Sequence, residues 1–150
     1  MGEVSVERRS ANRPLLRSGY VLVLLGLLTG VATPLFRNPR MGLSAHLTGF
    51  LAGILVVVLA LSWRHLQLSA RVERTVEALA RVAGFGTWAA SVLAAVWGTS
   101  RLTPIAGAGH TAAAWQELLT RGLAIAAALA TIGTVGFVIR ALHDRPADAS

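Results

Sequence analysis

One histidine lies inside a long apolar stretch of the sequence, where a polar side chain is unexpected. His46 follows Met41 by five residues, in a run that is mostly hydrophobic up to Trp63. At about 1.5 Å of helical rise per residue, it would lie roughly 8 Å inside a membrane-spanning helix. Polar side chains at that depth are costly and often functional. The imidazole could ligate a metal or bond to a neighbouring helix, and the residues leave both alternatives open.

Three glycines share a helical face with His46. Gly42, Gly49 and Gly53 stand four residues before it and three and seven residues after it, so all four fall on one side of a helix. A lane without side chains lets a bulky or flat object approach the backbone. Another helix is the commoner object. A porphyrin plane, with the imidazole as axial ligand, is the sharper alternative.

Polar residues near one end of the apolar runs are further candidates for chemistry. Arg40 and Ser44 shortly precede His46 and are the candidate catalytic residues. Arg101 and Glu117 are expected near the same membrane boundary. Each charge is either a solvated side chain at the interface, the commoner case, or part of a polar rim over a pocket.

Several chemistries are excluded by what the sequence lacks. Without cysteine there is no disulfide, thiolate metal site or cysteine nucleophile, and without lysine there is no Schiff base. No two histidines are spaced four apart on one helix, so a metal site made by protein ligands only is not expected. The net charge of +7 comes from arginines beside apolar runs. These are typical of membrane-helix flanks, and a nucleic-acid partner is not expected.

The elements that must position these residues are membrane helices. Of the 150 residues, 54% are hydrophobic and only 14% are charged, and the charges fall in short blocks between long apolar runs. Continuous runs without alternation favour helices over a β-barrel. The sequence predicts an all-α integral membrane protein, a single membrane domain over residues 1–150. We expect a four-transmembrane-helix bundle with spans at about 16–36, 41–63, 78–99 and 115–142. A polar helical stretch is expected from Arg64 to Arg81.

Within these spans, packing roles are expected for a few residues. Gly26 and Gly30 have the spacing of a helix-packing pair. Trp88 falls near the middle of the third span and is expected to pack against another helix.

The arginines predict an orientation. Ten of the 14 flank the same side of the predicted spans: Arg8, Arg9, Arg13, Arg17, Arg64, Arg71, Arg74, Arg81, Arg140 and Arg145. The positive-inside rule then places both termini in the cytoplasm, with the protein in the inner (cytoplasmic) membrane.

Residues 38–47 resemble a segment of the hydroxylaminobenzene mutases, in the run Asn38-Pro39-Arg40-Met41-Gly42-Leu43-Ser44-Ala45-His46-Leu47. The similarity continues at Gly49 and Gly53, at Leu66-Gln67-Leu68-Ser69, at Trp97-Gly98, at Pro104-Ile105-Ala106 and at Gln116-Glu117. It covers most of residues 20–135. More distantly, the four-span layout and the histidine of the second span look like styrene oxide isomerase.

This resemblance implies an intramolecular hydroxyl transfer that converts an aryl hydroxylamine into an aminophenol. It also implies a haem b cofactor with His46 as axial ligand, a small aromatic substrate, and a homo-oligomer, with a trimer as the arrangement in the more distant family. Both families are expected to carry asparagine where this chain has Ala52, and the mutases an acid where it has Thr48. The loss of that asparagine could change the substrate or abolish the mutase activity.

Other functions stay open on the sequence. A non-catalytic protein that binds haem or a partner could keep the same scaffold, and an isomerase of aryl epoxides fits the more distant resemblance. A small four-span drug exporter is disfavoured, because such exporters need a glutamate in the first span and none lies between Tyr20 and Phe36.

Overall fold

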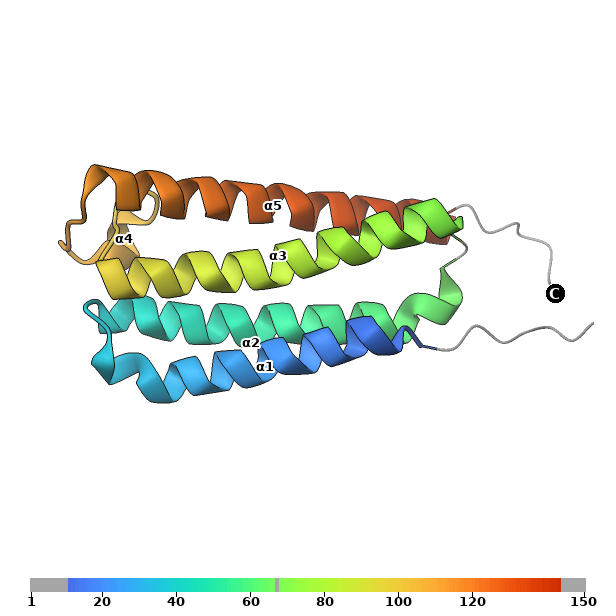
Figure 1. The fold of residues 1–150 in the computed structure, drawn as a ribbon, viewed down its shortest axis with the longest axis horizontal. Coiled ribbons are helices and arrows are strands. Elements are labelled where there is room, and N and C mark those ends of the chain that lie inside the picture. Colours follow the sequence, from blue (N-terminus) through green and yellow to red (C-terminus); the bar gives the residue numbers. More distant parts are fainter. Residues whose placement is uncertain (1–10, 67, 144–150) are drawn as a thin grey trace, which may run out of the picture.

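The computed structural model describes residues 11–66 and 68–143, which form four long helices and their short connections (Figure 1). The long helices are α1 (Arg13–Ala32), α2 (Pro39–Ser62), α3 (Ala70–Trp97) and α5 (Ala114–His143). The connections contain the 3-10 turns η1 (Thr33–Leu35) and η2 (Trp63–His65) and the short helix α4 (Pro104–Gly107). All four long helices are long and apolar enough to cross a membrane. The predicted all-α protein with four spans is confirmed.

Short polar motifs set where the long helices begin and end. The Asn12 side chain accepts a hydrogen bond from the backbone N–H of Leu15 at 3.0 Å, and Asn38 accepts one from Met41 at 3.1 Å. Each bond satisfies a donor that the first helical turn leaves free. A proline stands in the first turn of both helices, where its missing N–H loses nothing. Helix α3 ends at Gly98, whose φ of +72° is the left-handed conformation that glycine tolerates best.

The polar stretch between the second and third spans differs from its prediction. One helical stretch was expected from Arg64 to Arg81, but α3 begins only at Ala70, after η2 and a non-helical link. Leu66 gives the physical reason. Its side chain is only 1% exposed and packs in the core with Trp63, so the chain turns inward here instead of continuing as a helix.

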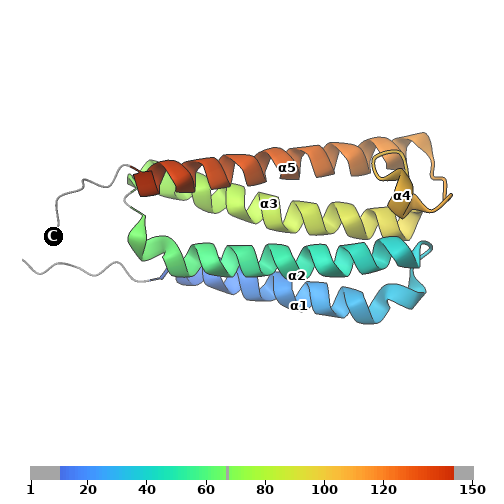
Figure 2. The same cartoon turned by 180° about the vertical axis from the view of Figure 1, so that it is seen from behind.

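The four long helices pack in the order α1, α2, α3, α5. Helix α1 lies along α2, α2 along α3, and α3 along α5, whereas the described parts of α2 and α5 barely touch. The two opposite views show the α3–α5 pair beside the α1–α2 pair (Figures 1 and 2). We call the end of the bundle that carries η1 and α4 the α4 end, and the other the η2 end.

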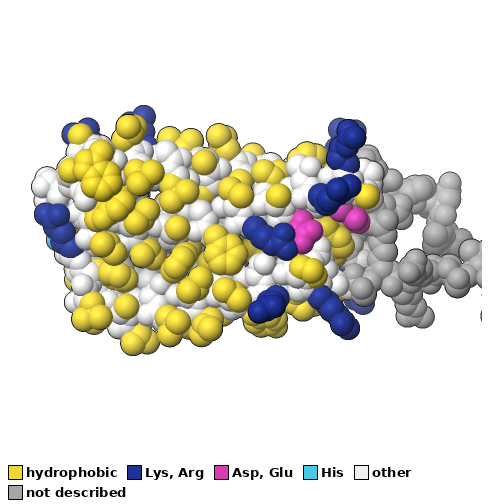
Figure 3. All heavy atoms as spheres, viewed as in Figure 1, with side chains coloured by type: hydrophobic (Ala, Val, Ile, Leu, Met, Phe, Trp, Pro, Cys, Tyr) yellow, Lys and Arg dark blue, Asp and Glu magenta, His cyan; other side chains and the backbone are white. Residues whose placement is uncertain are grey.

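On the face shown in Figure 3, apolar side chains cover most of the bundle, and the arginines lie toward its two ends. In the apolar 18-residue stretch of α5, only 17% of the residues are buried inside the chain, whereas 39% are buried in the corresponding stretch of α3. Such a surface suits lipid and would be unfavourable in water. Which end faces the cytoplasm stays a prediction, and three of the arginines that support it, Arg8, Arg9 and Arg145, lie outside the described residues.

Candidate functional site around His46

His46 lies half-buried on α2, toward the α4 end. Its Nδ1 atom is 2.8 Å from the carbonyl oxygen of Gly26 on α1. A carbonyl oxygen can only accept, so Nδ1 is the donor and carries the proton, which leaves the lone pair of a neutral imidazole on Nε2. Among the described residues, Thr120 Oγ1 is the only enclosed side-chain N or O atom without a hydrogen-bond partner. Nε2 of His46 also has no hydrogen-bond partner in the described residues, but it is not fully enclosed.

Two glycines of α1 make room for this imidazole. A Cβ atom added at Gly30 would lie 2.7 Å from Nδ1 of His46 and 3.0 Å from both Cγ and Cε1. A Cβ atom at Gly26 would lie 2.5 Å from the backbone nitrogen of Phe50, which is on α2. The packing role predicted for the glycine pair is confirmed. In addition, Gly26 supplies the acceptor for His46 and Gly30 forms the floor under its ring, which the spacing did not indicate.

The glycine lane of α2 is filled by protein. A Cβ atom at Gly49 would lie 2.9 Å from the Cα of Gly26, and one at Gly53 would lie 2.7 Å from the backbone nitrogen of Val23. A Cβ atom added at Gly42 would lie 2.5 Å from Cδ2 of the Phe36 ring. Of the two objects that the lane could receive, another helix is therefore the one found within this chain. The cofactor-binding role predicted for Gly42, Gly49 and Gly53 stays a prediction.

Trp88 connects α3 to the helix pair that holds His46. Its indole Nε1 donates to the Thr29 hydroxyl on α1 at 3.0 Å. Its ring also covers Gly49 on α2, where an added Cβ would lie 2.5 Å from Trp88 Cδ1. The predicted packing role of this mid-span tryptophan is confirmed, and its N–H has a specific partner. No sequence signal linked Trp88 to Thr29, because their contact depends on how three helices meet.

The candidate catalytic residues Arg40 and Ser44 are not brought to the imidazole by any hydrogen bond in the described part of the chain. Arg40 is exposed in the first turn of α2. Ser44 is half-buried and precedes His46 by two residues. Two residues turn a helix by about 200°, so Ser44 lies roughly opposite His46 on α2. Their catalytic roles stay predictions.

The loops of the α4 end are held by two buried polar side chains. Asn38 is 1% exposed, and its amide donates to the carbonyl oxygens of Ala106 at 3.0 Å and Gly107 at 3.2 Å. Glu117 is 6% exposed, and its carboxylate accepts the backbone N–H groups of Ser100 at 2.9 Å and Arg101 at 3.2 Å. The expectation that Glu117 is a solvated interfacial charge or part of a pocket rim is therefore wrong. Backbone donors from the loop enclose its carboxylate instead.

A groove of about 550 Å³ lies between α2, α3 and α5, and apolar side chains make up most of its lining. Leu51 and Leu55 line it, and they stand five and nine residues after His46. At about 100° per residue they lie roughly 140° to 180° around α2 from the imidazole. Ala52, where the resemblance led us to expect asparagine, also lines this groove. One chain thus presents His46 and an apolar groove on opposite sides of the same helix.

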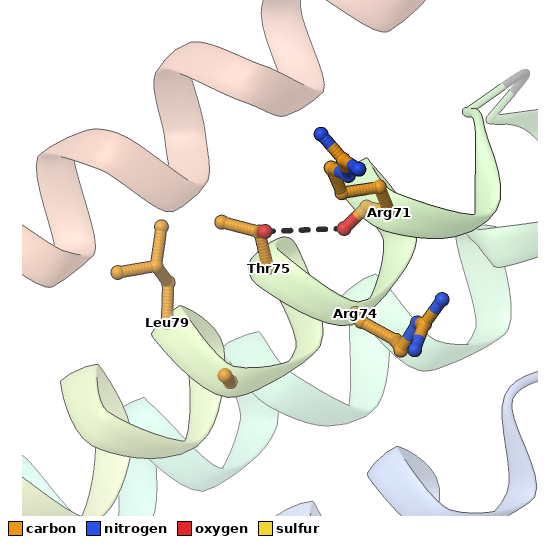
Figure 4. Close-up of a pocket in the computed structure, with 5 residues that line it drawn as sticks. Arg71, Arg74, Thr75 and Leu79 are labelled. Atoms are coloured by element: carbon orange, nitrogen blue, oxygen red, sulfur yellow. Dashed lines mark hydrogen bonds between the residues drawn. The ribbon is translucent and has the colours of Figure 1, made fainter.

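A second cavity, of about 580 Å³, lies near the η2 end of α3 and is lined by Arg71, Arg74, Thr75, Ala78 and Leu79 (Figure 4). The two arginines point in different directions in the close-up, and the Thr75 hydroxyl donates to the Arg71 carbonyl of its own helix. None of the predicted site residues lines this cavity. It is a basic surface hollow apart from the site around His46.

Comparison with known proteins finds relatives over all four long helices. A family model described as styrene oxide isomerase matches residues 11–143. The chain is 38% identical over 136 residues to hydroxylaminobenzene mutase HabB of Ectopseudomonas oleovorans, which covers 90% of this chain and 83% of the relative. It is also 38% identical over 104 residues to hydroxylaminobenzene mutase HabA of the same organism, covering 69% and 77% of the two chains. No solved structure matches the chain.

Proposed function

The chain belongs to the styrene oxide isomerase family and is an isomerase with four membrane helices, and from this premise we propose that it converts an aryl hydroxylamine into an aminophenol. In this reaction the N–O bond breaks and a C–O bond forms on the ring. The ring carbon gives up a proton, the nitrogen gains one, and no redox equivalent is consumed. The two relatives named as hydroxylaminobenzene mutases support this substrate class.

The observation that carries the proposal is the state of His46. With its proton held on Nδ1 by the Gly26 carbonyl, the half-buried imidazole keeps the lone pair of Nε2 available, with no partner for it among the described residues. This is the arrangement of a metal-ligating histidine, whose second nitrogen is fixed by a hydrogen bond. His46 would therefore hold a haem b through Nε2. Bound there, haem would supply a Lewis-acid iron that weakens the N–O bond of the substrate.

The remaining residues of the site exclude water and hold the substrate. The groove between α2, α3 and α5 has an apolar lining, and its volume of about 550 Å³ is ample for one aromatic ring. An apolar site protects a cationic intermediate from capture by water. A small aromatic substrate also partitions into the bilayer, so a groove in a lipid-facing surface can be filled from the membrane.

A homo-oligomer would bring the two halves of this site together. His46 and the groove lie on opposite sides of α2, so a head-to-tail ring of copies can place the imidazole of one protomer against the groove of the next. A trimer, as implied by the resemblance, is such a ring. In the inner membrane, the arginine-rich η2 end would face the cytoplasm, together with both termini.

The test combines absorption spectroscopy with product analysis on the detergent-purified protein. We expect a Soret band from protein produced with ample haem, its loss in His46→Ala, and aminophenol from hydroxylaminobenzene. Gly136→Ala is the matched control, because an added Cβ at Gly136 meets nothing within 4 Å. A wild-type protein that stays colourless in ample haem would refute the haem part of the proposal.

Styrene oxide is the second substrate to try, because the family description favours an isomerase of aryl epoxides as the second candidate. Turnover of styrene oxide without turnover of hydroxylaminobenzene would replace the first activity by the second. Haem binding without turnover of either would favour the non-catalytic alternative.

A further inference from the structure

Trp88 lies where α1, α2 and α3 meet, against Gly49, which follows His46 by about one turn of α2. Its ring and the Cα of Gly26 both lie against Gly49, since a Cβ atom there would be 2.5 Å from the indole and 2.9 Å from that Cα. The indole thus covers a point where the backbones of α1 and α2 lie close together. Its N–H crosses to α1 and bonds to Thr29 at 3.0 Å.

The Thr29 hydroxyl uses both of its hydrogen-bonding functions. It donates its proton to the carbonyl oxygen of Leu25 at 2.7 Å, so its lone pair is what accepts the indole N–H of Trp88. The side chain is 6% exposed, which leaves water little access as a substitute. Thr29 stands next to Gly30 and three residues after Gly26, so any rotation of α1 that breaks this bond also turns both glycines away from His46.

We propose that Thr29 and Trp88 are positioning residues for His46. Their hydrogen bond holds α1 in the rotation that aims the Gly26 carbonyl at Nδ1 and keeps Gly30 under the ring. Through that carbonyl they fix the proton on Nδ1 and keep the lone pair on Nε2. The inference rests on the proposed function where it assigns a ligand role to His46, but the position of the proton is a property of the apoprotein.

The decisive measurement is the tautomer of His46 in the apoprotein. Nitrogen-15 NMR of protein labelled at histidine and held in detergent micelles distinguishes Nδ1–H from Nε2–H, and the signals of His46 are those that disappear in His46→Gln. We expect an Nδ1–H imidazole in the wild type. Thr29→Val, which keeps the shape and removes the hydroxyl, and Trp88→Phe, which keeps a ring and removes the N–H, should both give a mixture of tautomers.

Two further variants separate positioning from packing. Thr29→Ser restores the hydroxyl and should restore the single tautomer. Thr75→Val is the matched control, since Thr75 also bonds to the carbonyl four residues before it but lies at the other end of the bundle. If Thr29→Val and Trp88→Phe only lower the unfolding temperature and keep the wild-type tautomer, the proposal is overturned.

Haem binding gives the second readout. Loss of a residue that orients a ligating histidine typically weakens metal affinity by about 10- to 100-fold. We expect that range for haem in Thr29→Val and near wild-type affinity in Thr29→Ser. A wild-type protein that binds no haem would defeat the haem part of the proposed function, and the tautomers of the apoprotein would still decide the positioning proposal.

Discussion

Gly30→Ala tests whether the site depends on the close contact between the imidazole of His46 and the backbone of α1 at Gly30. The new methyl would lie 2.7 Å from Nδ1 of His46, whereas unstrained contacts between such atoms are about 3.5 Å or longer. The ring must therefore retreat by about 0.8 Å. The added Cβ would stand over the face of the ring, since it is almost as close to Cγ and Cε1 as to Nδ1, whereas the Nδ1–H bond to Gly26 lies in the ring plane. The retreat therefore carries Nδ1 sideways, out of line with the Gly26 carbonyl, and misaligns the 2.8 Å hydrogen bond.

The expected magnitude follows from these distances. Misalignment of the hydrogen bond removes up to about 1.5 kcal/mol. Overpacking adds about 1 kcal/mol, at the low end of its range because the ring can tilt. Alanine regains up to about 1 kcal/mol through its higher helix propensity. The free energy of unfolding should thus fall by no more than about 2.5 kcal/mol, while the lone pair on Nε2 is held less firmly.

Two assays separate these effects. Unfolding in detergent should give the small loss of stability, and haem titration by Soret absorption should show an affinity at least about tenfold weaker. Gly136→Ala is the control, since its added Cβ meets nothing within 4 Å. Identical haem affinity in Gly30→Ala and Gly136→Ala would refute the argument that Gly30 positions the His46 imidazole.

Three further predictions concern the loops and the groove. Asn38→Ala removes a helix cap and two hydrogen bonds to loop carbonyls, so the free energy of unfolding should fall by about 2–4 kcal/mol. Asn12→Ala removes only a cap and should lower it by about 1 kcal/mol. Equal losses in the two variants would contradict the role of Asn38 in the loop. Glu117→Gln leaves one of two part-buried loop N–H groups without an acceptor and should lower the free energy of unfolding by about 1–2 kcal/mol, so an unchanged unfolding curve would count against it. Ala52→Phe fills part of the groove, so product formation should drop while the Soret band is kept; unchanged turnover would remove the groove from the site.

The four spans were predictable because the bilayer imposes a length and a composition on each helix. The helix starts at Asn12 and Asn38 are also local, since a cap needs only a few residues of sequence. The link after η2 was not predictable in this way. Leu66 stops a helix there by packing in the core, and a tertiary contact of that kind leaves no local signal.

The site could be predicted only in part, because it too depends on tertiary contacts. The depth of His46 in an apolar run marked it as a candidate. However, the sequence could not decide what its glycine face meets, because that depends on which helix packs there. The roles of Gly30 and Trp88 toward the imidazole appear only once α1, α2 and α3 are placed together. The burial of Glu117 likewise depends on how a loop folds back over α5.

The hydrogen-bond acceptor of His46, the Gly26 carbonyl, suits a membrane environment because it is uncharged. A ligating histidine is commonly oriented by a carboxylate, but an ionised carboxylate at this depth would be costly to bury. The Gly26 carbonyl supplies the same acceptor without a charge, and it is already present in the helix backbone. It can reach the imidazole only because no side chain stands at Gly26 or Gly30, where an added Cβ would strike α2 or the ring. The small-residue spacing of α1 therefore serves two purposes at once, since the close helix approach that packs α1 on α2 is also what fixes the proton of His46.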